Sequence, residues 1–131
     1  MPTIEIFKNE PDVRSYAAGS AIFKEGETGD VMFAVLEGEV ELRNKQRVLR
    51  IMVPGGIFGE MAIIENQPRS ADAIALTDCR VAAVNQKRFL ALVSQVPFFA
   101  IQMLQILSER LRMETMDASS VSANKEHQIS S

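Results

Sequence analysis

The chain has 131 residues, of which 47% are hydrophobic and 24% charged, as expected for one globular domain that buries its own core. Its formal net charge is −3 at pH 7, whereas a stand-alone nucleic-acid-binding domain is usually basic, so the charge disfavours that class of function. The single cysteine, Cys79, excludes an internal disulfide, and no signal peptide or membrane-spanning apolar run is visible. We therefore expect a soluble, cytoplasmic protein.

The first two thirds of the chain consist of short apolar runs separated by glycines, a pattern typical of short β-strands. Residues 31–36 form one such run, and residues 40–43 alternate apolar and polar side chains, as a strand with one solvent-facing side does. Evenly spaced short strands with turns between them predict a β-sandwich or a small barrel. Three glycines in this part are interpreted simply as turn residues: Gly26, Gly29 and Gly38.

A segment in the middle of the chain interrupts the strand pattern and carries the candidate chemistry. Gly59 precedes a short helix-forming run, so backbone N–H groups at the start of that helix are available to an anion. Arg69 follows nine positions after Glu60. Its planar guanidinium suits a phosphate, whereas the Glu60 carboxylate accepts hydrogen bonds and suits a sugar hydroxyl. Together they predict a nucleotide pocket; an exposed ion pair between the two residues is the alternative.

Residues 86–113 change to helical spacing. Residues 86–93 predict one helix, and Pro97 can open a second helix that runs to Met113. The second helix has two apolar stripes: Phe99, Met103, Ile106 and Met113 on one, and Ala100, Leu104, Leu107 and Leu111 on the other. One stripe suffices for packing on a barrel. The second stripe indicates either contact with the same helix of a second subunit or deeper burial within the monomer, and both interpretations stay open.

The middle segment resembles a known motif. Phe58-Gly59-Glu60-Met61-Ala62, followed by Pro68-Arg69-Ser70-Ala71, closely resembles the phosphate-binding cassette of cyclic-nucleotide-binding domains, which occur in catabolite activator proteins, kinase regulatory subunits and gated channels. Residues 18–30 and 35–40 resemble strands and glycine turns of the same family. We use "the cassette" for residues 58–71.

The resemblance implies a fold and a domain organisation. The fold is mainly β with flanking α: an eight-stranded jelly-roll β-barrel followed by C-terminal helices. One cyclic-nucleotide-binding domain would occupy residues 1–113. Residues 114–131 form a polar tail with almost no apolar residue to bury, and we expect that tail to be disordered.

The resemblance also implies a role for each cassette residue. Glu60 would accept a hydrogen bond from the ribose 2′-hydroxyl, and Arg69 would pair with the cyclic phosphate. Further donors would be the backbone N–H groups of Gly59, Ala62 and Ala71 and the hydroxyl of Ser70. Apolar cover would come from Val53, Met61 and Ile63. A serine after the arginine, where cGMP sites tend to have threonine, favours cAMP over cGMP.

Three more positions bear on the site. Arg110 lies within an apolar stripe of the last helix. Three interpretations stay open: it stacks on the base, it reaches Glu60, or it extends its charged end to solvent. Thr115 falls where activator proteins contact the base. Asp72 stands where many relatives have threonine or alanine; its carboxylate would weaken phosphate binding if it pointed inward, but not if it pointed to solvent.

The sequence therefore predicts a non-catalytic, regulatory signalling module that binds cAMP or cGMP. Binding would reposition the C-terminal helix for an unidentified effector protein or for a second subunit, in a homodimer through helix 97–113. We expect no enzyme activity, cofactor, metal, nucleic acid or membrane partner. Activator proteins continue into a helix-turn-helix where this chain ends, so we expect no transcription-factor activity from this chain alone.

Three alternatives are kept. The first is a jelly-roll assembly module that no longer binds ligand, and the second is a fragment of a larger channel or regulator. The third and most remote is a cupin-type enzyme. Such an enzyme needs a metal cluster of several histidines inside the barrel, whereas the one histidine here, His127, lies in the tail.

Overall fold

The structure, a computed structural model, describes the backbone of residues 6–126 and the side chains of residues 6–114. Its strands are β1 (Val13–Tyr16), β2 (Ala21–Phe23), β3 (Val31–Glu37), β4 (Val40–Asn44), β5 (Arg47–Met52), β6 (Ile57–Phe58), β7 (Asp72–Ala75) and β8 (Cys79–Asn85). Its helices are the 3₁₀ turn η1 (Ile6–Asn9), α1 (Met61–Ile64), α2 (Gln86–Gln95) and α3 (Phe98–Glu126).

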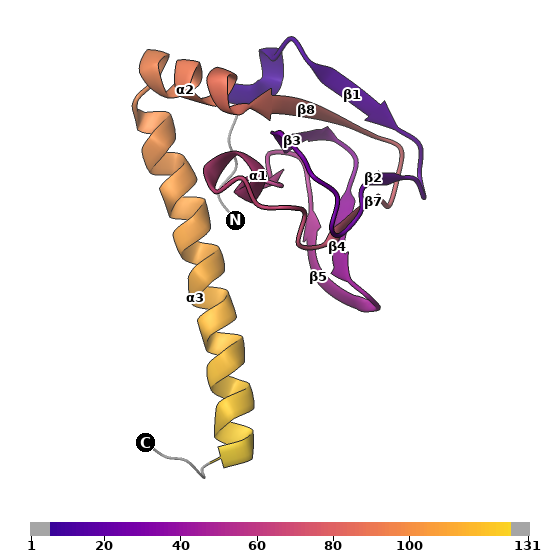
Figure 1. The fold of residues 1–131 in the computed structure, drawn as a ribbon, viewed down its shortest axis with the longest axis vertical. Coiled ribbons are helices and arrows are strands. Elements are labelled where there is room, and N and C mark those ends of the chain that lie inside the picture. The colour runs from indigo at the N-terminus through magenta and orange to yellow at the C-terminus, as the bar shows by residue number, and fades with distance from the viewer. Residues whose placement is uncertain (1–5, 127–131) are drawn as a thin grey trace.

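The eight strands within residues 6–126 form two four-stranded antiparallel sheets. Their orders are β1-β8-β3-β6 and β2-β7-β4-β5. Helices α2 and α3 follow the last strand and lie along one side of the barrel, and α3 extends well beyond it (Figure 1). This architecture confirms the predicted mainly β jelly-roll fold with C-terminal helices.

The core divides into two clusters on opposite faces of β3. Between the two sheets, Phe23, Phe33 and Phe58 pack with ring centroids 5.3 to 6.0 Å apart. On the helix side, Phe7 of η1 lies with its ring centroid 5.4 Å from that of Phe99 of α3. Successive β3 residues enter the two clusters alternately. This is why residues 31–35 form an unbroken apolar run, since both faces of the strand are buried.

Helices α2 and α3 begin where the sequence predicted. The Asn85 side chain caps α2 by accepting a hydrogen bond from the Arg88 backbone N–H at 2.8 Å, and Pro97 directly precedes α3. The two helices are bent 119° relative to each other. Within the described residues no single helix is both long enough and apolar enough to cross a bilayer. Only α2 taken together with the part of α3 up to Glu114 would be long and apolar enough, and that pair is bent.

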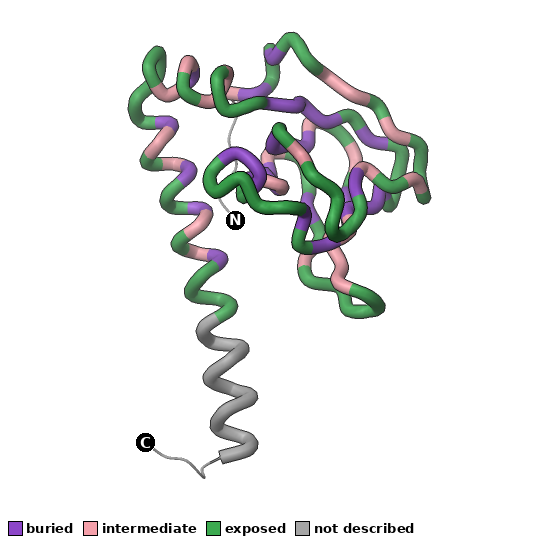
Figure 2. Tube along the Cα trace, in the orientation of Figure 1, coloured by how far each residue is buried: buried purple, intermediate pink, exposed green. Residues whose placement is uncertain are grey.

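Only one of the two predicted stripes on α3 is buried. Phe99, Met103 and Ile106 pack into the helix-side core, and the purple positions along α3 in Figure 2 mark this buried stripe. Leu104 and Leu111 on the other stripe are 61% and 63% exposed, so deeper burial within the monomer is the wrong interpretation. Met113, assigned to the buried stripe, is 52% exposed, because it lies beyond the last turn that packs on the barrel.

The last helix extends further than expected. The sequence pattern predicted its end at Met113, whereas the backbone remains helical to Glu126. The structure does not describe the side chains beyond Glu114 or any part of residues 127–131. The predicted base contact of Thr115 and much of the predicted tail therefore lie outside the described residues. The division into a domain over 1–113 and a tail over 114–131 stays a prediction.

Candidate functional site

The cassette begins with a backbone turn that only glycine accommodates. Gly59 follows β6 and has φ +74°, in the left-handed region. A Cβ built there would also lie 2.7 Å from Arg69 Nη1. Glu60 comes next as the N-cap residue of α1, and its backbone carbonyl accepts from the N–H groups of Ile63 and Ile64. Gly59 thus allows both the turn into α1 and the close approach of the arginine.

Arg69 is fixed inside the barrel wall. Its side chain is only 7% exposed, Nη1 donates to the Gly59 carbonyl at 3.0 Å, and Nη2 donates to the Val31 carbonyl at 2.8 Å. The guanidinium also lies over the Phe23 ring, 4.2 Å from its centroid. Burial lowers the pKa of Arg69 from its ordinary value, and the carboxylates of Asp30, Glu27 and Glu60 oppose that change. The result is a desolvated cation in a single position.

The loop between β2 and β3, residues 24–30, covers Arg69. A Cβ on Gly29 would lie 2.4 Å from Arg69 Nη2 and 2.5 Å from Cζ. The interpretation of Gly29 as a turn glycine is therefore wrong. A glycine is needed here because any side chain would occupy the space of the Arg69 guanidinium. Gly26 is a turn glycine as predicted, because its φ is +89° and no atom lies near its Cβ position. Gly38 is also in the left-handed region, at φ +86°, and a Cβ there would in addition collide with the backbone of Asp78.

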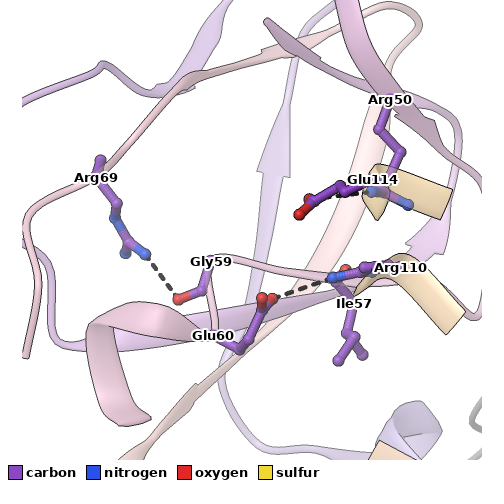
Figure 3. A network of polar contacts seen from close by, with 7 residues as sticks. All are labelled: Arg50, Ile57, Gly59, Glu60, Arg69, Arg110 and Glu114. Atoms are coloured by element: carbon purple, nitrogen blue, oxygen red, sulfur yellow. Dashed lines mark hydrogen bonds and ion pairs between the residues drawn. The ribbon is translucent and has the colours of Figure 1, made fainter. Parts of the chain in front are cut away.

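Glu60 is paired with the last helix rather than with Arg69. Its Oε1 lies 3.3 Å from Nη1 of Arg110 on α3, and Arg110 Nη2 donates to the Ile57 carbonyl (Figure 3). Glu60 and Arg69 are both buried, so the alternative of an exposed ion pair between them is wrong. Of the three interpretations of Arg110, the structure agrees with the one in which its side chain reaches Glu60.

Arg110 has an unusual environment for an arginine. It is 8% exposed, and its Nε is buried without a hydrogen-bond partner among the described residues. Burial lowers the pKa of Arg110; the Glu60 carboxylate opposes this change, and the nearby charge of Arg50 adds to it. Because unpartnered buried donors are costly, Nε marks a place where a hydrogen-bond acceptor would be stabilising.

A second ion pair between barrel and helix was missed at the sequence level. Nη2 of Arg50 on β5 lies 4.0 Å from Oε1 of Glu114, one helical turn beyond Arg110 on α3 (Figure 3). Arg50 pairs in register with Leu42, whose side chain packs on the inner core, so Arg50 is on the inward face of its strand. Alternation through Leu49-Arg50-Ile51 would have placed Arg50 on the solvent face, whereas Leu49 and Ile51 are the exposed residues, so this local pattern could not have found the pair.

The other predicted site residues lie around these charged groups. Ala62 and Ala71 are buried, Ser70 and Met61 are exposed, and Val53, directly after β5, is exposed. The Ala62 N–H is turned inward toward the Gly59 carbonyl at 3.3 Å. Ile63 packs into the helix-side core. Whether any of them contacts a ligand stays a prediction.

The Asp72 side chain is partly exposed and is directed toward the 24–30 loop. Its Oδ1 accepts a hydrogen bond from the backbone N–H of Glu25, in the 24–30 loop, at 2.7 Å. Of the two orientations weighed from the sequence, the structure has the one directed away from the site, in an exposed hydrogen bond. Cys79 is a small buried residue, as its strand position indicates, and burial raises the pKa of its thiol.

The arrangement provides binding groups of opposite kinds. Glu60 supplies a buried carboxylate acceptor, and Arg69 and Arg110 supply buried cations on either side of it. Within the described residues no three histidine, cysteine, aspartate or glutamate side chains gather into a possible metal site. The geometry suits a ligand that carries both a hydroxyl donor and an anion.

Comparison with known proteins agrees with this chemistry. Residues 13–96 match the family model described as "Cyclic nucleotide-binding domain". The chain is 34% identical over 104 residues to the cyclic AMP receptor protein of Thermus thermophilus, covering 76% of this chain and 48% of that protein. It is 34% identical over 87 residues to a cAMP-dependent protein kinase regulatory subunit of Aspergillus fumigatus, covering 65% of this chain and 21% of that subunit.

A solved structure gives the same result. The crystal structure of the Thermus thermophilus catabolite activator protein superposes with a TM-score of 0.77 and 31% identity, covering 85% of this chain and 55% of that one. The chain spans about half the length of the receptor protein that it matches. The similarity therefore covers the whole barrel but not the whole of these relatives.

Proposed function

Since the chain belongs to the cyclic nucleotide-binding domain family, we propose that it binds cAMP in preference to cGMP and acts as a non-catalytic signalling module. It is a binding domain of the regulatory type, and the names of both curated relatives above refer to cAMP. The serine directly after Arg69 supports the same preference. The proposal covers this domain, whose partner is an unidentified effector or a second copy.

In this proposal Arg69 binds the cyclic phosphate. Its guanidinium is held by two backbone carbonyls and the Phe23 ring, and these contacts use only part of its five N–H donors. A group that is already fixed loses little conformational entropy when the ligand arrives. Its desolvation also strengthens attraction to an anion, because the local dielectric is low. Ser70 and the backbone N–H groups of Gly59 and Ala71 supply further donors, and the Ala62 N–H joins them only if it gives up its bond to the Gly59 carbonyl.

The observation that carries the signalling part of the proposal is the Glu60–Arg110 pair. Glu60 is the proposed acceptor for the ribose 2′-hydroxyl, and the same carboxylate anchors α3 through Arg110. A ligand that donates to Glu60 changes how tightly α3 is held. So does one that accepts from Arg110 Nε, which has no hydrogen-bond partner among the described side chains. Ligand binding and helix position are therefore thermodynamically linked.

The exposed stripe of α3 is the proposed output surface. Leu104 and Leu111 present large apolar side chains to solvent on the side away from the barrel core. Such a stripe suits the same helix of a second copy, which would place two α3 helices together around a two-fold axis. A movement of α3 would then be read directly by the partner.

We place the protein in the cytoplasm, since a single cysteine cannot form an internal disulfide and fits a reducing compartment. We assign it no cofactor, enzymatic activity, nucleic-acid partner or membrane partner.

Titration calorimetry with cAMP and cGMP tests the binding proposal. We expect saturable binding of cAMP that is tighter than that of cGMP, and we expect Arg69→Ala to weaken it by at least about a hundredfold. Arg80→Ala is the matched control, because Arg80 is an exposed arginine that pairs with Glu37. Absence of binding of either nucleotide to the unmodified chain would disprove the proposal.

A further inference from the structure

Asp72 makes a contact that the family resemblance does not explain. It lies three positions after Arg69, where a carboxylate close to a bound phosphate would be repulsive. In the structure its Oδ1 instead accepts from the Glu25 N–H at 2.7 Å. The carboxylate is thus used to hold the 24–30 loop.

That loop hydrogen-bonds to both the carbonyl and the N–H of the Arg69 backbone. The Gly26 N–H donates to the Arg69 carbonyl at 2.8 Å, and the Arg69 N–H donates to the Glu27 carbonyl at 2.8 Å. Further along, Gly29 packs against the guanidinium, and the Val31 carbonyl accepts from Nη2. The loop therefore fixes the Arg69 backbone and packs against one side of the guanidinium, which the Gly59 and Val31 carbonyls and the Phe23 ring hold on the barrel side.

The loop has few other anchors. The Glu27 carboxylate accepts from the Lys24 N–H at 3.0 Å, and the Glu27 N–H donates to the Lys24 carbonyl at 3.1 Å, so these bonds only close the loop on itself. Within the described residues, the hydrogen bonds that tie residues 24–27 to another part of the chain go to two residues, Arg69 and Asp72. Removal of the Asp72 acceptor would leave Arg69 clamped by a loop that is itself loosely held.

We propose that Asp72 is a positioning residue for Arg69: it holds the 24–30 loop against the arginine and so keeps the guanidinium ready for the cyclic phosphate. The inference rests on the proposed function for the identity of the ligand. The position of Arg69 itself rests on the contacts described above and does not depend on ligand.

The test compares two substitutions at Asp72 with one elsewhere. Asp72→Asn keeps the acceptor oxygen and removes the charge, whereas Asp72→Ala removes both. Asp78→Ala is the matched control, because Asp78 Oδ1 accepts from the Ala18 backbone N–H at 2.9 Å, a bond of the same kind in a turn without described contact to Arg69. We expect the cAMP dissociation constant to rise about tenfold in Asp72→Ala, and to stay within about twofold in Asp72→Asn and Asp78→Ala.

A second measurement reports on Arg69 without ligand. In nitrogen–proton correlation spectra of the unliganded protein, the Arg69 Nε–H signal, assigned with Arg69→Lys, should shift and exchange faster with water in Asp72→Ala but not in Asp78→Ala. Equal effects of the two alanine substitutions, or an Asp72→Asn variant as weak as Asp72→Ala, would overturn the inference. If the unmodified chain binds no cyclic nucleotide, the proposed function fails, and the Arg69 signal alone decides the role of Asp72.

Discussion

The two halves of the cassette are held by different parts of the molecule. Arg69 is fixed by the barrel itself, through the carbonyls of Gly59 and Val31 and the ring of Phe23. Glu60, only nine positions earlier, is bonded to Arg110 on the helix that leaves the barrel. The arginine half is therefore preorganised independently of α3, while the carboxylate half depends on where α3 lies.

Under the proposed function, this difference separates ligand affinity from signalling. The phosphate would bind to an arginine that is already held in place, so the arginine half should contribute most of the binding free energy. A sugar hydroxyl meets a carboxylate that is shared with α3, so the carboxylate half should contribute most of the coupling. Each prediction below perturbs one half and asks whether the other responds.

The largest effect is expected from Gly29→Ala, which disturbs the arginine half without removing a charged or hydrogen-bonding side chain. Its Cβ would lie 2.4 Å from Arg69 Nη2, so the guanidinium must move. We expect cAMP affinity measured by calorimetry to fall about a hundredfold. Gly26→Ala is the control: it strains the same loop, because Gly26 has φ +89°, but no atom lies near the new Cβ. Similar losses of affinity in both variants would mean that loop strain, rather than Arg69, is responsible.

Arg110→Ala disturbs the carboxylate half. It leaves the buried Glu60 without its cation, and we expect the free energy of unfolding in urea to fall by about 3 kcal/mol. Hydrogen exchange of the α3 backbone should become faster without ligand and should no longer respond to cAMP. Arg112→Ala, an exposed arginine on the same helix, serves as control. An α3 that still responds to cAMP in Arg110→Ala would show that the coupling does not pass through this pair.

The double substitution Leu104→Ser and Leu111→Ser tests the output surface and leaves both halves of the cassette intact. Both side chains are exposed, so the monomer loses little stability. If two copies associate through α3, sedimentation should show a shift from dimer to monomer with cAMP affinity nearly unchanged. Leu90→Ser, an exposed leucine on α2, is the control. A sedimentation coefficient that does not change in the double variant would contradict association through this stripe.

The smallest effect is expected from Glu114→Gln. The Arg50–Glu114 pair is 4.0 Å long, and the Glu114 side chain is 70% exposed, so solvent screens it. We expect the free energy of unfolding to change by less than about 0.5 kcal/mol, with the small difference disappearing at high salt. A change comparable to that of Arg110→Ala would mean that the second pair shares the anchoring of α3.

Much of the fold was predictable because its determinants are local. Alternation in residues 40–43, helical spacing in residues 86–93 and Pro97 each act within a few residues, and strands and helices appeared where those patterns predicted them. The end of α3 was not predictable in the same way, since a polar composition does not by itself stop a helix. Nor was the exposure of Leu104, because periodicity shows which side chains share a face and not which face is covered.

By itself, the sequence determined the order and spacing of the cassette: a glycine turn, a carboxylate and an arginine followed by small residues, all within one short segment. Only the tertiary structure decided the partners of those groups. Arg110 reaches Glu60 from fifty positions away, Gly29 makes room for Arg69, and Asp72 turns to Glu25 instead of toward the site. The physical reason is that a buried charge is stabilised by whichever groups the packing of distant elements brings beside it, and no local pattern encodes that choice.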